Sequence, residues 1–91
     1  MSTSDPVEIP FQTLAVLEDV ARERERQNDK WGRIPGHWPS HNGVKLAVLV
    51  EEVGEVASAL YDGHGPNRLR EELIQVAAVA VAWAETLPKE A

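Results

Sequence analysis

Residues 48–57 read Val-Leu-Val-Glu-Glu-Val-Gly-Glu-Val-Ala, which sets three glutamates into an otherwise apolar segment. In a helix that turns about 100° per residue, Glu51 and Glu55 lie about 40° apart, and Glu52 and Glu55 about 60° apart. The three carboxylates therefore share one side of the predicted helix. A helix that is apolar on almost every other side is typical of a buried element. Carboxylates on such a helix need a cation to offset their repulsion and lost hydration.

The pattern is repeated twenty positions later, where residues 71–77 read Glu-Glu-Leu-Ile-Gln-Val-Ala. Glu72 and Gln75 match Glu52 and Glu55, with Gln in place of the second Glu. If the two helices pack as antiparallel neighbours, these four side chains surround a common point. Their hard oxygen ligands suit Mg²⁺, or alternatively Mn²⁺. Glutamate pairs are also common on solvated helix faces, so the metal-site prediction depends on the second cluster and on the apolar surroundings.

The rest of the chain predicts an all-α protein of three helices. Apolar residues at three- and four-residue spacing favour a helix over residues 11–29, and helices over 44–62 and 67–87 carry the acidic motifs. No segment has the alternating pattern of a strand. We expect a compact helical bundle, with the two acidic helices antiparallel and with a core completed by oligomerisation. The predicted organisation is a flexible tail over residues 1–10, one helical domain over 11–88 and a short tail over 89–91.

Gly, Pro and cap-forming residues predict the helix ends. Glycines and prolines make residues 32–42 a predicted loop, with Ser40 or Asn42 as the cap of the following helix. Gly63 marks the end of that helix, and Asn67 is a plausible N-cap of the next helix.

Composition limits the classes of function. The chain has 91 residues, no Cys and a net charge of −6, so it lacks a basic surplus for binding a nucleic-acid polymer. Its longest apolar stretch, residues 73–84, is interrupted by Gln75 and is too short for a membrane span. No signal peptide is visible at the start. We therefore expect a soluble, cytoplasmic protein that does not bind membranes.

These residues resemble the MazG-like family of all-α nucleoside triphosphate pyrophosphohydrolases. That family carries E-E-x-x-E on one helix and E-x-x-D on the next, which here read Glu51-Glu52-Val53-Gly54-Glu55 and Glu72-Leu73-Ile74-Gln75. The resemblance covers roughly residues 15–86. It includes the segment Glu25-Arg26-Gln27-Asn28-Asp29-Lys30-Trp31-Gly32 and the run from Leu73 to Trp83. The departure is Gln75, a neutral amide where the family has Asp.

The resemblance implies Mg²⁺-dependent hydrolysis of an NTP or dNTP to the monophosphate and pyrophosphate by a homodimer or homotetramer. Glu52, Glu55 and Glu72 would hold the metal, with Gln75 as a weaker ligand and Glu51 orienting or deprotonating the attacking water. Clearing of noncanonical nucleotides is implied by the resemblance alone.

Four residues before the loop are candidates for binding the substrate. Arg26 and Lys30 could meet phosphate, Trp31 could stack on a base, and Gln27 could hydrogen-bond the base. Each also has a structural interpretation, as a solvated or packed helix residue. Lys45 could approach phosphate, but we expect it on the solvated surface. The rival functions are a helical interaction module that binds a nucleotide without turnover, and a pure oligomerisation module.

Overall fold

A computed structural model describes residues 5–31 and 41–89, except for the side chain of Trp31. This part of the chain forms three helices: α1 (Phe11–Trp31), α2 (Asn42–Tyr61) and α3 (Pro66–Glu85). It contains no strand, so the prediction of an all-helical fold is confirmed for the described residues. The tails predicted over residues 1–10 and 89–91 lie partly outside the described part, and the domain boundaries stay a prediction.

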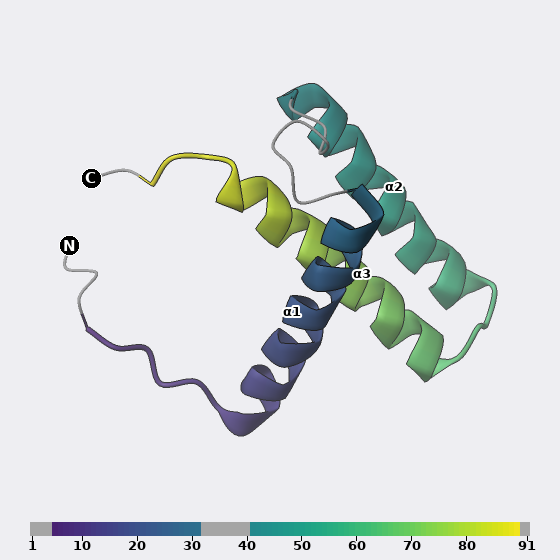
Figure 1. Cartoon of the computed structure of the whole chain (residues 1–91). Coiled ribbons are helices and arrows are strands. Elements are labelled where there is room, and N and C mark those ends of the chain that lie inside the picture. The colour runs from purple at the N-terminus through teal and green to yellow at the C-terminus, as the bar shows by residue number, and fades with distance from the viewer. Residues whose placement is uncertain (1–4, 32–40, 90–91) are drawn as a thin grey trace.

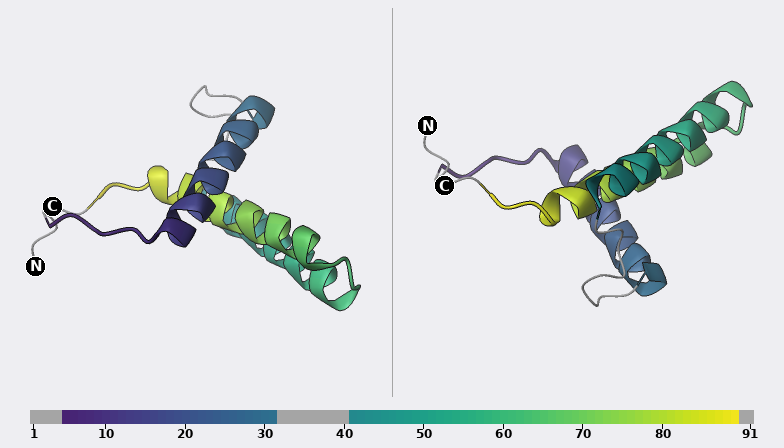
Figure 2. Two further views of the ribbon diagram at one scale, coloured as in Figure 1. Left: turned by 90° about the horizontal axis from the view of Figure 1, so that it is seen from below. Right: turned by 90° about the horizontal axis from the view of Figure 1, so that it is seen from above.

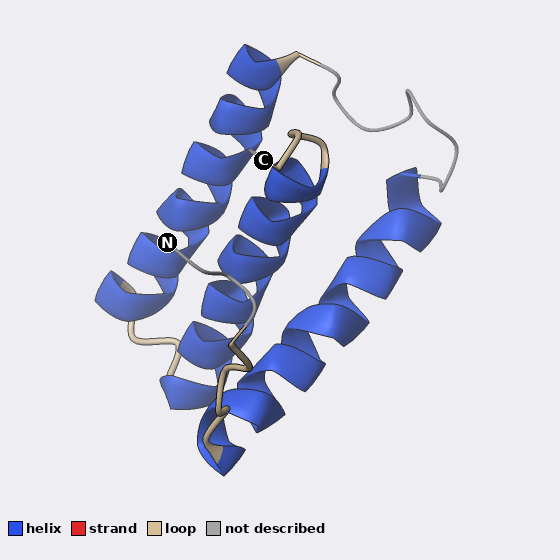
Figure 3. Cartoon of the chain, turned by 90° about the vertical axis from the view of Figure 1, so that its left-hand side faces the viewer, coloured by secondary structure: helices blue, strands red, loops and turns tan. Residues whose placement is uncertain are grey.

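Helix α3 lies between the other two helices. Figure 3 shows α1 and α2 on opposite sides of α3, and Figures 1 and 2 show that α2 runs alongside α3 while α1 crosses it. Arg24 of α1 pairs with Glu85 at 2.9 Å, and Arg70 of α3 pairs with Asp19 at 2.8 Å. These two ion pairs fix α1 at both ends of its crossing with α3.

The start of α2 lies beside the end of α3. The Trp83 indole Nε1 donates a hydrogen bond to Asn42 Oδ1 at 3.0 Å, and Lys45 Nζ donates to Thr86 Oγ1 at 2.9 Å. Lys45 is only 5% exposed, so the expectation that it is solvated is wrong. A lysine can bury its aliphatic stem while its ammonium reaches a polar partner, and here that partner is a hydroxyl just past α3.

The turn between α2 and α3 follows from two glycines. Gly63 and Gly65 have φ values of 70° and 90°, a region that residues with a Cβ rarely adopt. The predicted helix end at Gly63 is thus confirmed. The cap of α3 is Gly65, so the prediction of Asn67 as cap is wrong. Pro66 explains the difference, because proline is favoured at the first helical position, where its missing N–H is not needed.

The cap of α2 also differs from the prediction. His41 is the cap, and its Nδ1 accepts a long hydrogen bond from the Gly43 N–H at 3.4 Å. Asn42 lies inside the helix and uses its side chain to hold Trp83. Ser40, the other predicted cap, lies outside the described residues.

The core of the single chain is small. Its fully or nearly buried apolar side chains are Val20, Ala59, Ile74, Ala78, Val79 and Ala82. Most apolar side chains of α2 are half exposed, so the expectation of a buried second helix does not hold within one chain. In the described part, no helix is both long and apolar enough to cross a membrane.

Candidate functional site

The acidic motif of α2 turns one of its three glutamates toward α3. Glu52 is half-buried, whereas Glu51 and Glu55 are exposed on the flank of the helix. The Oε2 atom of Glu52 is buried and has no hydrogen-bond partner. A buried carboxylate oxygen is costly unless a cation or a hydrogen-bond donor binds it.

The motif of α3 is buried more deeply. Glu72 is 2% exposed, Gln75 is half-buried and Glu71 is exposed. Glu72 Oε1 forms an ion pair with Arg68 Nη2 at 2.8 Å, while its Oε2 is buried without a hydrogen-bond partner. The two matched glutamates, Glu52 and Glu72, thus each keep one unsatisfied oxygen.

The carboxylates of the two motifs act on each other. Loss of hydration raises the pKa of Glu52 above its ordinary value of 4.5. Neighbouring negative charges then raise this pKa further, and Glu72 has the largest effect among them, followed by Glu55, Glu51 and Glu23. The charge of Glu72 on α3 therefore acts on the half-buried carboxyl of Glu52 on α2.

Glu23 of α1 is the site residue that sequence reasoning missed. Its side chain is only 12% exposed, and it acts on Glu52 from a third helix. Arg26 holds it with two hydrogen bonds, from Nε to Oε1 at 2.8 Å and from Nη2 to Oε2 at 2.5 Å. The sequence did contain a signal for this role of Glu23. Glu23 lies four residues before Gln27, a predicted substrate-binding residue, so the two share one side of the helix.

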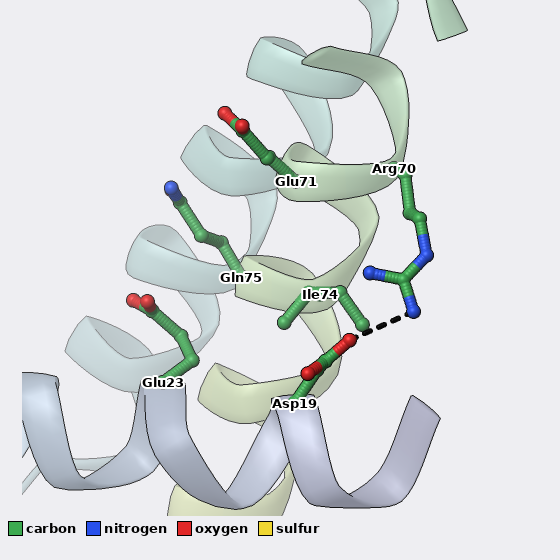
Figure 4. A pocket seen from close by; sticks show the side chains of 6 residues that line it. All are labelled: Asp19, Glu23, Arg70, Glu71, Ile74 and Gln75. Carbon is green, nitrogen blue, oxygen red and sulfur yellow. Dashed lines mark ion pairs between the residues drawn. The ribbon is translucent and has the colours of Figure 1, made fainter. Parts of the chain in front are cut away.

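An open pocket of about 400 Å³ lies between α1 and α3. Figure 4 shows that Glu23, Glu71 and Gln75 point to the same side of α3, while Arg70 reaches across to Asp19. The hydrogen bond from Arg70 lowers the pKa of Asp19. Asp19 is therefore paired with a cation at one edge of the pocket, whereas Glu23 and Glu71 add carboxylates to its lining and Gln75 adds a neutral amide.

The predicted substrate-binding residues have different environments. Arg26 is exposed and already paired with Glu23, and Lys30 is exposed near the end of α1. Gln27 is buried, and its Oε1 has no hydrogen-bond partner. The side chain of Trp31 lies outside the described part, so its stacking role stays a prediction.

The donor set fits a divalent cation in its chemistry, although the side chains do not close around one point. Glu52 Oε2, Glu72 Oε2 and Gln27 Oε1 are buried oxygens without partners, one from each helix, and oxygen ligands suit Mg²⁺. Within residues 5–31 and 41–89, no three His, Cys, Asp or Glu side chains are arranged so that they could hold one metal ion. Binding an ion would therefore require the glutamate rotamers to change.

No family model matches this chain, and comparisons with curated proteins and with solved structures find no significant match. The resemblance to the MazG-like family therefore stays a prediction.

Proposed function

We propose that this chain is a Mg²⁺-dependent nucleoside triphosphate pyrophosphohydrolase, in which α2 and α3 act as the antiparallel pair that carries the site. The supporting observation is that Glu52 on α2 and Glu72 on α3 each keep a buried oxygen that lacks a hydrogen-bond partner, and that the charge of Glu72 raises the pKa of Glu52. Facing carboxylates that are partly or fully buried are costly unless a cation offsets them. A divalent ion supplies more charge to such a pair than one side-chain ammonium or guanidinium does.

The proposed metal ligands are Glu52, Glu55 and Glu72, with Gln75 contributing a neutral oxygen. Glu55 is exposed and would turn inward to reach the ion, which its position next to Glu52 on the helix allows. When bound, Mg²⁺ would neutralise the triphosphate and acidify a water. Glu51 lies on the solvent side of the cluster, where a carboxylate can orient that water and accept its proton.

In the proposed reaction, water attacks the α-phosphorus and the bond from that phosphorus to the bridging oxygen breaks, which releases pyrophosphate. Arg26 and Lys30 are the proposed phosphate-binding cations, with Gln27 and Trp31 next to the nucleoside. Arg26 would exchange its contact with Glu23 for phosphate, a step that its exposure permits. The sequence suggests a cytoplasmic setting for this chemistry.

The alternative is a helical module that binds a nucleotide without turnover. Two observations favour it: Gln75 adds no charge to the cluster, and within the described residues the glutamates are not grouped around one point. Pyrophosphate release from a panel of NTPs and dNTPs with MgCl₂ decides between the two functions. Release from any triphosphate supports the enzyme, while nucleotide binding without release from any of them supports the module.

The proposed assembly is a homodimer, or a dimer of such dimers, joined through α2. One stripe along this helix follows a repeating spacing of four and three residues and is exposed throughout, made up of Leu46, Val50, Val53, Ala57 and Leu60. Such spacing is typical of a helix that packs against another helix. The stripe contains no charge, so a second copy can pack there although each chain carries a net charge of −6.

We expect the wild-type chain to be a dimer or tetramer at micromolar concentration, measured by light scattering after gel filtration. Val50→Glu should produce monomers, because it buries an unpaired charge in the proposed interface. Val16→Glu is the matched control, since Val16 is comparably exposed on α1 at 40%. A wild-type monomer at that concentration would contradict the proposed assembly.

A further inference from the structure

The first turn of α3 holds a cation against the most buried carboxylate of the cluster. Arg68 Nη2 lies 2.8 Å from Glu72 Oε1, and the Glu72 side chain is only 3% exposed. Arg68 itself is half exposed, and a second contact at 3.4 Å joins its Nη1 to Glu71 Oε2. The guanidinium therefore lies at the edge of the site and reaches inward to a single oxygen of Glu72.

This arrangement neutralises the cluster incompletely. Glu72 Oε2 stays buried without a hydrogen-bond partner, and so does Glu52 Oε2 on α2. Arg68 meets one oxygen of Glu72 through a single ion pair rather than the stronger two-pronged contact, and Arg26 acts on Glu52 as a nearby charge. A divalent ion in the same place would supply twice the charge and could use both unsatisfied oxygens.

We propose that Arg68 is a resident counter-ion, which a divalent cation displaces from Glu72 and which then binds the phosphates of the incoming nucleotide. This proposal rests on the proposed function, because it needs the metal at Glu72. Arg68 and Glu72 are four residues apart and share one side of α3, with Cβ atoms about 5–6 Å apart, so a released guanidinium stays on the side of the helix that carries Glu72. Its half-exposed side chain can swing outward without unpacking the core.

The first experiment measures binding of Mg²⁺ alone to the full chain by calorimetry. Arg68→Gln removes the competing charge and should tighten Mg²⁺ binding about 3- to 10-fold, whereas Arg68→Lys should stay near wild type. Arg22→Gln is the matched control, because Arg22 pairs with Glu18 and Asp19 of its own helix and not with a glutamate of either motif. This control should leave the affinity for Mg²⁺ unchanged.

The second half of the proposal is tested with inorganic tripolyphosphate in the presence of Mg²⁺. Arg68→Gln should weaken binding of this probe about 10-fold, and Arg68→Lys should weaken it less, since an ammonium keeps the charge but loses the planar fork. The opposite signs of the two effects, tighter metal and weaker phosphate, distinguish a displaced counter-ion from a residue that only supports the fold.

A measurement on the wild-type protein covers the case in which Arg68→Gln does not fold. The Nε–H resonance of Arg68, assigned with Arg68→Lys, should shift on titration with MgCl₂ and not with NaCl at matched ionic strength. Mg²⁺ binding that leaves this resonance and the affinity of the variants unchanged would overturn the role of Arg68 alone. Absence of Mg²⁺ binding to the wild-type chain would overturn the proposed function as well.

Discussion

On α2 the acidic motif exposes Glu51 and Glu55 and turns only Glu52 toward α3, whereas on α3 the matching Glu72 is 2% exposed and Gln75 is half-buried. The two segments have nearly the same order of residues. Their different burial comes from the position of their helices, because α3 is covered by α1 and α2 on two sides and α2 is covered by α3 on one side.

The comparison gives a physical reason for Gln75, which stands where the motif of α2 has Glu55. A residue packed between α1 and α3 loses more hydration than one on the open flank of α2, so a neutral amide is less costly there than a carboxylate. The same argument explains why Glu72 has a guanidinium partner at 2.8 Å. Burial, rather than the motif itself, sets how much each carboxylate depends on a cation.

The largest expected effect is on turnover when the most buried carboxylate loses its charge. Glu72→Gln should lower kcat at least ~100-fold, a loss of about 2.7 kcal/mol in transition-state stabilisation. Glu52→Gln and Glu55→Gln should each do the same if all three hold metal. The assay is pyrophosphate release, and Glu18→Gln on the exposed side of α1 is the control. Full activity of the Glu72→Gln variant would contradict the proposal of a metal site shared by α2 and α3.

A smaller effect is expected when position 75 of α3 carries a glutamate, as the matching position 55 of α2 does. Gln75→Glu should tighten Mg²⁺ binding about 5-fold, or ~1 kcal/mol, if residue 75 is a ligand. Without Mg²⁺ the variant should melt at a lower temperature than wild type, because it adds a carboxylate to a crowded acidic region. Unchanged Mg²⁺ affinity in calorimetry would mean that the residue only packs against its neighbours.

The smallest effect concerns the stability of the metal-free protein and its dependence on pH. The pKa of Glu52 is raised above 4.5 in the folded state, so at a pH between the unfolded and folded pKa values the folded chain binds more protons than the unfolded one. As far as Glu52 is concerned, the folded chain is therefore most stable below pH 4.5, where this group is neutral, and it loses stability as the pH rises through the folded pKa and Glu52 ionises. Glu52→Gln should prevent this loss of stability at higher pH, because an amide does not ionise. Because Glu52 is partly solvated, screening limits the gain to ~0.5 kcal/mol, or about 2–4 °C in Tm at pH 7.

Melting curves in EDTA at pH 4 and pH 7 test this prediction. At pH 4 the wild-type Glu52 is already protonated, so the two proteins should melt at similar temperatures there. An equal difference at both pH values would show that the effect arises from packing and not from the charge of Glu52.

Local sequence signals predicted most of the fold. The apolar spacing placed all three helices, and Gly63 marked the end of α2 as observed. The misplaced cap at Asn67 has a local cause, because Pro66 moves the start of α3 toward the N-terminus. The misplaced cap at Asn42 has a tertiary cause, because its side chain accepts a hydrogen bond from Trp83 of α3. The site was predicted in part. The positions of Glu52 and Glu72 followed from the repeated motif, whereas Glu23 was missed because its role depends on a helix that arrives from another part of the chain.

The sequence by itself determined that the chain is helical, that three glutamates share one side of α2 and that a matching pair follows on α3, because each of these depends only on the helical repeat. Only the tertiary structure decided which of these carboxylates is buried, which cation serves it and which apolar side chains stay exposed. Those outcomes depend on how the helices cross. Ala57 and Ala77, for example, occupy the same place in the two motifs, yet one is exposed and the other is half-buried against the core, because α3 has neighbours on two sides and α2 has one.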